Sequence, residues 1–157
     1  DCDIKWPNDV LINGKKVVGI LTEMHAELDI VRSVVIGIGI NVNDKRDEIP
    51  ASVKEVATSL AIEKGETLKR APLIAEVLNE IEQLYDLYLD RGFKVIRPLW
   101  EAHSISLYRH IRARTAQNVI YGYAKGISDE GVLLIEDEHG NVHEIYSADI
   151  DIPPQNV

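Results

Sequence analysis

The 157-residue chain has little of several residue types, and each scarcity excludes a class of protein. Its one cysteine, Cys2, cannot form an internal disulfide, which agrees with a reducing compartment such as the cytoplasm. No apolar run approaches the roughly 20 residues that cross a bilayer, and no basic-then-apolar N-terminal segment indicates secretion. Lys and Arg number 17 against 26 Asp and Glu, and the net charge of −9 argues against a nucleic-acid partner. We expect a cytoplasmic globular protein without a membrane partner.

The first 43 residues carry most of the information in the sequence. Asn13-Gly14 is a strong hairpin signal, because both residues tolerate positive φ. It separates a predicted strand at residues 10–12 from a return strand at residues 16–24. A polar turn at residues 27–29 then leads into a third predicted strand at residues 31–43.

The third predicted strand has two unlike faces, because alternate residues point to opposite sides. One face is aliphatic and reads as a buried core face, formed by Val34, Ile36, Ile38, Ile40 and Val42. The other face carries Gly37, Gly39 and Asn41, and Gly19 interrupts the neighbouring strand in the same way. Glycines inside strands mark close approach by a ligand or by another backbone, so this face predicts a slot; a bulge or a tight packing contact remains the alternative.

Three segments in this region, KWPND, KKVVGILTE and GIGINVN, in this order and spacing, resemble the biotin protein ligase family. GIGIN is not a dinucleotide fingerprint, because it lacks the third glycine and lies within a strand. The resemblance implies an ATP-dependent ligase that forms biotinyl-AMP and transfers biotin to a lysine of a biotin carboxyl carrier domain of a carboxylase. ATP and biotin would be its substrates, with Mg²⁺ carried by ATP, and homodimer formation stays open.

The rest of the chain predicts helices followed by short strands, and the fold class is α+β. Helices are expected at residues 52–64, with Ser52 as the cap, at 68–92 and at 93–103. From Ser104 the period changes from 3.6 to 2, with strands at residues 107–114, 118–127, 132–136 and 142–146. The resemblance implies a mixed sheet like that of class II aminoacyl-tRNA synthetases over residues 1–103, an SH3-like barrel over residues 104–152, and a tail at 153–157.

The resemblance also implies chemical roles for individual residues. Lys16 matches the family lysine whose charge stabilises the α-phosphate of ATP, whereas Lys15 is expected to face solvent. Asn8 and Asp9 match a pair beside the reacting groups, and Asp9 would accept the proton of the acceptor lysine or help to hold Mg²⁺. From the sequence alone, Asn8-Asp9 also reads as a turn that begins the hairpin, and Lys16 as a solvated lysine.

The biotin wall implied by the resemblance consists of Gly19, Leu21, Gly37 and Gly39, with Asn41 facing adenine. Trp6 is expected to be a packing anchor rather than a ligand. Further along the chain, we expect the arginines at 109, 112 and 114 to be a solvated strand face, and we expect no metal site at His139 and His143.

Two other functions remain open from the sequence. A lipoate–protein ligase or related acyl-adenylate transferase shares the broader fold. An SH3-like module that acts through protein contacts alone would leave the glycines and Asn41 unexplained. Because the chain begins at Asp1 without the upstream Arg/Gly-rich loop of the family, we expect a fragment, which alone could be inactive.

Overall fold

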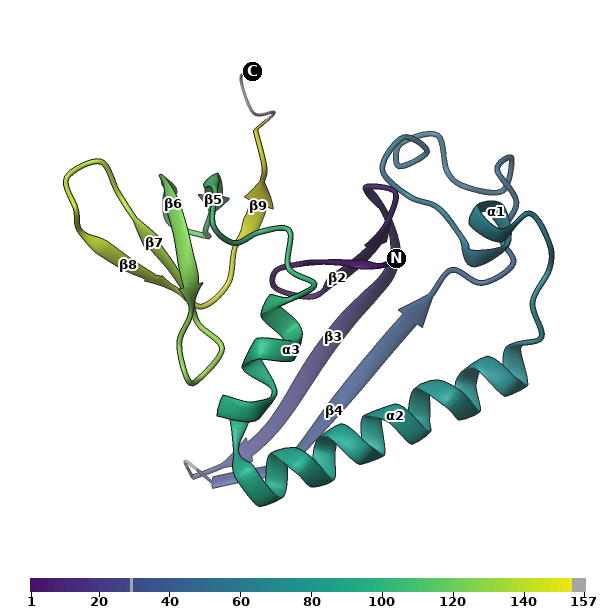
Figure 1. Cartoon of the computed structure of the whole chain (residues 1–157), viewed down its shortest axis with the longest axis horizontal. Coiled ribbons are helices and arrows are strands. Elements are labelled where there is room, and N and C mark those ends of the chain that lie inside the picture. Colours follow the sequence, from purple (N-terminus) through teal and green to yellow (C-terminus); the bar gives the residue numbers. More distant parts are fainter. Residues whose placement is uncertain (29, 154–157) are drawn as a thin grey trace. The chain divides into compact units, whose positions relative to one another are not determined.

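The computed structural model describes residues 1–28 and 30–153; Asp29 of the predicted turn and residues 154–157 of the predicted tail lie outside the described residues. The chain forms two compact units. Unit 1 comprises residues 1–3 and 8–73, and unit 2 comprises residues 4–7 and 74–157. The KWPND segment is therefore divided between the units after Pro7. Figure 1 gives the element labels used below.

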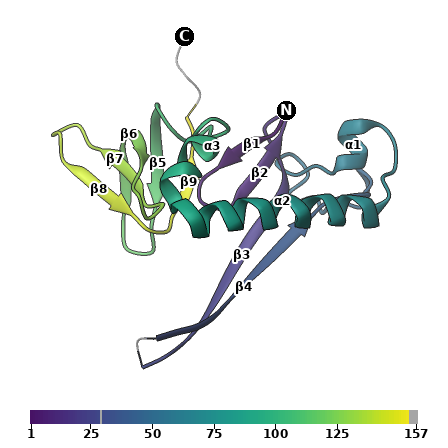
Figure 2. The same cartoon turned by 60° about the horizontal axis from the view of Figure 1, so that its bottom comes forward.

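Unit 1 is built on a sheet with the strand order β1-β2-β3-β4. Its strands are β1 (Asp3–Lys5), of which only Asp3 falls in unit 1, β2 (Asp9–Ile12), β3 (Lys15–Glu27) and β4 (Ile30–Ile40). The β2–β3 turn has φ values of 51° at Asn13 and 74° at Gly14, so the predicted hairpin is confirmed. β3 and β4 pair antiparallel as a long ribbon, which continues well beyond β2 (Figure 2).

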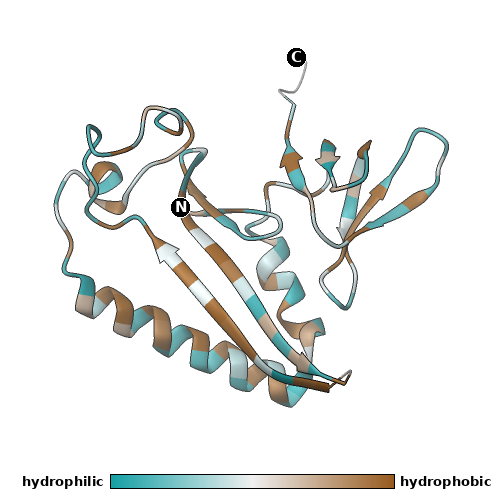
Figure 3. Ribbon diagram, turned by 180° about the vertical axis from the view of Figure 1, so that it is seen from behind, coloured by the Kyte–Doolittle hydropathy of each residue, from teal (hydrophilic) through white to brown (hydrophobic). Residues whose placement is uncertain are grey.

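β4 differs from its prediction in length and in burial. It ends at Ile40 instead of Asn43, because the carbonyl of Asn41 turns to accept the backbone N–H of Leu60. Pale glycine bands alternate with apolar residues along the strand (Figure 3). The predicted core face is buried only at its far end, where Val42 is 8% exposed; Val34, Ile36 and Ile38 are 51%, 60% and 36% exposed. Alternation determines which side chains share a face, but burial requires a second layer against that face.

The predicted helix over residues 52–64 is wrong in its first half. Only α1 (Leu60–Lys64) is helical, and residues 51–56 form turns. The N-cap is Ser59 rather than Ser52: its hydroxyl accepts the N–H of Ile62 at 3.2 Å and donates to the carbonyl of Asp44 at 2.7 Å. Gly65 ends α1 with φ 80°, as predicted.

Thr58 and Glu63 fasten α1 to the β2–β3 hairpin within unit 1. Thr58 is fully buried, and its hydroxyl donates to Glu63 Oε1 at 2.5 Å. The side-chain amide of Asn13 donates to Glu63 Oε2 at 2.6 Å. These hydrogen bonds, first from Thr58 and then from Asn13, hold the pKa of Glu63 below its ordinary value of 4.5.

The helices that follow agree with the predicted pattern. α2 (Arg70–Arg91) has Pro72 in its first turn and ends at Gly92, which has φ 73°. A short 3₁₀ turn, η1 (Phe93–Val95), leads into α3 (Arg97–Glu101), with Pro98 in its first turn. Among the described helices, none combines the length and the apolar character required to span a bilayer.

Unit 2 contains a second antiparallel sheet in the order β8-β7-β6-β5-β9. Its strands are β5 (His110–Arg114), β6 (Val119–Ile127), β7 (Leu133–Glu136), β8 (Val142–Ile145) and β9 (Asp149–Asp151). β5 begins three residues later than predicted, because Tyr108 has φ 58°. β9 was not predicted, and it pairs with β5. The order runs from β8 to β9 without closing, so the described residues form an open sheet rather than a closed barrel.

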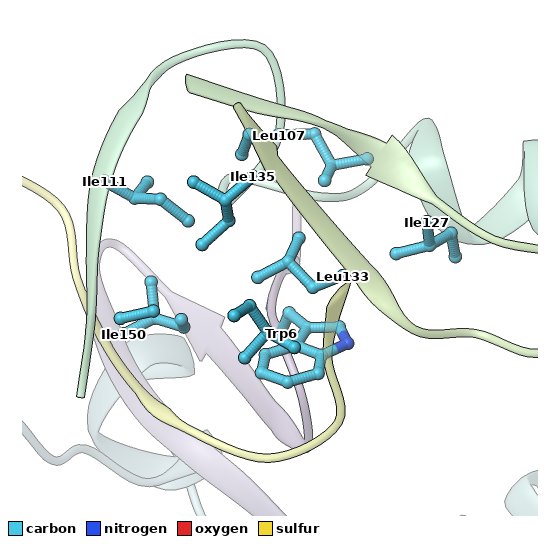
Figure 4. Close-up of a cluster of buried hydrophobic side chains, with 10 residues drawn as sticks. Trp6, Leu107, Ile111, Ile127, Leu133, Ile135 and Ile150 are labelled. Carbon is cyan, nitrogen blue, oxygen red and sulfur yellow. The ribbon is translucent and has the colours of Figure 1, made fainter. Parts of the chain in front are cut away.

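The core of unit 2 gathers the inward side chains of this sheet around Trp6 (Figure 4). Trp6 is 5% exposed and packs with Leu107, Ile111, Ala113, Ala124, Ile127, Leu133, Ile135, Ile145 and Ile150. Its backbone N–H donates to Ser106 Oγ at 3.0 Å, and its indole N–H to the carbonyl of Gly131 at 3.3 Å. Trp6 is therefore a packing residue, held by a part of the chain about one hundred residues away.

The core position of Trp6 leads to a stability prediction. Trp6→Ala should destabilise unit 2 by about 3–5 kcal/mol, the usual cost of deleting a large buried aromatic side chain. Denaturant unfolding followed by circular dichroism would measure this change. Tyr146→Ala is the control, because Tyr146 is 74% exposed and its loss should be nearly neutral. Equal effects of the two substitutions would contradict the assignment of Trp6 to the core.

The lowered pKa of Glu63 leads to a prediction about pH. The stabilisation by ionised Glu63 should be present above pH 4.5 and should be lost as the pH falls through the lower folded pKa. Glu63→Gln should weaken hydrogen-exchange protection of the Thr58 amide and remove most of the pH dependence that this protection shows as the pH falls below 4.5. NMR exchange rates, corrected for intrinsic exchange, would measure this.

The control for Glu63 is Glu66→Gln in the same segment. Glu66 also has a lowered pKa, because it hydrogen-bonds to Lys64, but that ion pair lies on the surface. Exposed pairs contribute little, so this variant should keep the pH dependence of the parent protein. A Thr58 amide whose protection responds equally to both substitutions would contradict the proposed link.

Candidate functional site

The β2–β3 hairpin places Lys16 beside Asp9. Lys16 Nζ lies 2.5 Å from Asp9 Oδ1, and the two side chains are 45% and 22% exposed. Asp9 Oδ1 is itself inaccessible to solvent and has no other polar partner among the described residues. A buried carboxylate oxygen faced by one ammonium holds that cation in a defined position.

A hollow of about 450 Å³ opens next to this ion pair, within the usual range of ligand pockets. We call it the Lys16 pocket; it is lined by Lys16, Val17, Val18, Gly19, Gly39, Ile40, Asn41, Val53, Val56 and Ala57. All of these residues belong to unit 1. The structure therefore brings Lys16, Gly19, Gly39 and Asn41 together around one concavity.

Gly37 and Leu21 lie next to the Lys16 pocket but do not line it. In the β3–β4 ribbon Gly19 is opposite Gly39, and Leu21 is opposite Gly37, one step further along. Leu21 and Gly37 are both exposed. These residues extend the glycine-bearing face of the ribbon beyond the hollow.

The loop of residues 44–58 supplies a wall of the pocket, formed by residues that were not among the predicted site residues. The N–H of Lys16 donates to the carbonyl of Val56 at 2.7 Å, and the N–H of Thr58 donates to the carbonyl of Lys16 at 2.9 Å. This parallel bridge holds the loop against the start of β3. Val53 and Val56 line the pocket although both are exposed. Two valines three residues apart in a polar loop were the available signal.

The two asparagines of the predicted site use their amide N–H groups to hold backbone. The Asn8 side chain donates to the carbonyl of Ile20 at 2.8 Å, and the N–H of Ile20 donates to the carbonyl of Asn8 at 2.9 Å. The Asn41 side chain donates to the carbonyl of Thr58 at 3.0 Å. Asn8 thus fixes β3 next to Gly19, and Asn41 ties the covering loop to the end of β4.

A second hollow, of about 640 Å³, lies on unit 2 and is lined by residues of β5, β6, β7 and the turn after β7. Two arginines of β5, Arg112 and Arg114, both pair with Asp151 of β9. In the turn, Asp137 accepts hydrogen bonds from His143 and Asn141, which lower its pKa strongly. These charged groups stabilise the sheet and its turn, so the Lys16 pocket remains the candidate site.

The arrangement in unit 1 fits one kind of ligand. The Lys16 pocket has aliphatic and glycine walls, the Lys16 cation at its rim and the amide side chain of Asn41 in its lining. A molecule with an apolar body and an anionic group would bury the body against the walls and present the anion to Lys16.

Comparison with known proteins shows which proteins the chain is similar to. Residues 1–41 match the model of the biotin/lipoate A/B protein ligase family, and residues 109–152 match the biotin protein ligase C terminal domain. The bifunctional ligase/repressor BirA of Bacillus subtilis (strain 168) is 53% identical over 150 residues, covering 96% of this chain and 46% of the relative. The biotin–[acetyl-CoA-carboxylase] ligase of Paracoccus denitrificans is 36% identical over 143 residues, which cover 87% of this chain and 58% of that relative. The chain thus spans about half the length of these curated relatives.

Solved structures agree with the sequence matches. The apo biotin protein ligase of Aquifex aeolicus superposes with a TM-score of 0.83 at 31% identity, covering 96% of this chain and 65% of that chain. The same enzyme in complex with biotin and ATP superposes with a TM-score of 0.80 at 31% identity, covering 96% of this chain and 61% of that chain. The chain belongs to the biotin protein ligase family.

Proposed function

We propose that this chain is the C-terminal part of an ATP-dependent ligase that forms biotinyl-AMP and transfers biotin to a lysine of a biotin carboxyl carrier domain. The observation that supports this most directly is the Lys16–Asp9 pair at the rim of a glycine-walled pocket. The family membership and the relatives solved with biotin and with ATP support the same reaction.

The proposed reaction has two steps in which negative charge develops on phosphate. The biotin carboxylate attacks the α-phosphorus of ATP and pyrophosphate leaves; the acceptor amine then attacks the acyl carbon and AMP leaves. Lys16 would stabilise the phosphate charge in both steps, because its ammonium is already oriented before the substrates bind. Gly19, Gly39 and the neighbouring Leu21 and Gly37 would contact biotin, and Asn41 the adenine edge.

Asp9 and Asn8 have separate parts in this proposal. Asp9 holds Lys16 through Oδ1, and its other carboxylate oxygen, Oδ2, would accept the proton of the acceptor lysine. Asn8 would act through the backbone of β3, since its amide is bonded to Ile20. Asp9 is the single carboxylate at the pocket rim among the described residues, so we propose that Mg²⁺ arrives with the ATP phosphates.

The same proposal includes the domain architecture of the chain and its location in the cytoplasm. We propose that residues 1–103 continue a sheet like that of class II aminoacyl-tRNA synthetases, and that residues 104–152 form an SH3-like domain. The match of residues 109–152 to the biotin protein ligase C terminal domain supports the second assignment. The compact units divide the chain differently, because unit 2 also includes α2 from Ile74 and α3. The exposed thiol of Cys2 is compatible with the cytoplasm.

A lipoate ligase is the second candidate, because the family model that matches residues 1–41 covers both biotin and lipoate ligases. Pyrophosphate exchange into ATP, measured with the complete gene product, separates the two activities. Exchange that depends on biotin supports the proposal, and exchange that depends on lipoate instead would replace it. Failure of both acids to promote exchange would leave the enzyme assignment without support.

The proposal predicts unequal effects of two adjacent lysines. Lys16→Ala should slow formation of biotinyl-AMP by about 10²–10³-fold in single-turnover assays, the usual loss for one well-placed electrostatic donor. Binding of biotin should weaken far less, because phosphate charge develops after biotin has bound. Lys15→Ala is the matched control at the same hairpin and should change the rate little. Similar small effects from both substitutions would remove Lys16 from the chemistry.

A further inference from the structure

Gly19 has no backbone reason to be glycine. Its φ lies outside the positive range that side chains avoid, and it lies inside β3 opposite Gly39. Glycine weakens a strand interior, so the residue is retained at a cost in stability. The cause must lie in the space above its Cα atom.

That space is occupied by the side chain of Lys16. A Cβ atom added at Gly19 would lie 2.9 Å from Lys16 Cε and 3.0 Å from Lys16 Nζ, which is too close for either atom to remain in place. The other glycines of this face differ. A Cβ at Gly39 would meet the carbonyl oxygen of Gly19 at 3.7 Å, and one at Gly37 that of Leu21 at 3.6 Å, both ordinary contacts.

A β-bulge explains how Lys16 reaches this position. Leu11 is opposite Lys16 and Val10 is opposite Val18, so Val17 is an extra residue in β3. The bulge interrupts the alternation of faces, and residues three apart, such as Lys16 and Gly19, come to share one side. On β2, Asp9 is opposite Gly19 and pairs with Lys16 Nζ at 2.5 Å. The lysine therefore passes over the bare Cα atom of Gly19 to reach Asp9.

We propose that Gly19 is a positioning residue that acts through Lys16, by leaving the path along which the ammonium reaches Asp9. A side chain at residue 19 would displace the ammonium from Asp9 and from its orientation at the pocket rim. The catalytic consequence rests on the proposed function of Lys16, whereas the placement itself does not. The competing explanation is that Gly19 only leaves room for biotin.

The first experiment measures the placement of Lys16 without any substrate. Limited acetylation of the complete gene product, followed by mass spectrometry, gives the labelling ratio of Lys16 to Lys15, with Lys15 as the internal standard. Gly19→Ala should raise this ratio severalfold, as should Asp9→Asn, because both release the ammonium from its ion pair. Gly39→Ala is the matched variant on the facing strand and should leave the ratio unchanged.

The substitution at Gly19 should leave the protein folded. The colliding atoms are the far end of a flexible side chain, which can swing toward solvent, and alanine is compatible with an extended strand. Thermal unfolding of each variant would verify this. A ratio that rises in Asp9→Asn but stays unchanged in folded Gly19→Ala would overturn the proposal.

The second experiment is a double-mutant cycle on adenylate formation with Gly19→Ala and Lys16→Ala. A displacement of about 1 Å can cost about 10²-fold in rate, so Gly19→Ala should slow the reaction by up to that factor when Lys16 is present. In the Lys16→Ala background it should cause little further loss, because the group on which it acts is absent. Equal losses in both backgrounds would show that residue 19 acts by filling ligand space and would overturn the proposal. Absence of any adenylate from the unsubstituted protein would reject the proposed function, and the labelling ratio would still decide the placement.

Discussion

The candidate site depends on how the backbone and side chain of one residue, Lys16, are held. Its N–H and its carbonyl bond to the loop at Val56 and Thr58, and its ammonium bonds to Asp9. These partners come from two separate places in the sequence: the residue that begins β2 and the loop before α1. Removing the loop bonds would free both the pocket wall and the strand end that carries the lysine. The same contacts that complete the fold of unit 1 therefore orient the charge that the proposed chemistry uses.

The KWPND segment contributes to both units, to the core of unit 2 and to the candidate site of unit 1. Residues 4–7 belong to unit 2, where Trp6 is part of the core, and residues 8 and 9 belong to unit 1. This short segment thus contains both a core residue and two residues of the candidate site. Asn8 donates a hydrogen bond to the backbone of β3, and Asp9 forms an ion pair with Lys16. Both the core contacts and the site contacts restrict the residue types in the segment, but only the site contacts concern the proposed chemistry.

The sequence predicted features that depend on neighbouring residues and missed those that depend on distant ones. Asn13-Gly14 and the glycine-bearing face of β4 follow from local φ preferences and from alternation, and both are present. The cap of α1 was misplaced, because Ser52 fits the local pattern but Ser59 has the distant partner Asp44. The walls from Val53 and Val56 depend on a bridge to Lys16, which no local pattern reveals. β9 is three residues long, too short for its period to be recognised.

The β-bulge connects these observations, because it determines which residues share a face with Lys16. In a regular strand Lys16 and Gly19 would point to opposite sides, and the ammonium could not cross residue 19. With Val17 as the extra residue, they share a side, while Val17 itself is buried in unit 1. The three-residue spacing between Lys16 and Gly19 therefore places them on the same face only because the bulge is present. The sequence shows the spacing, but the bulge is a property of the β2–β3 register, so the physical link between the two residues became visible only in the folded chain.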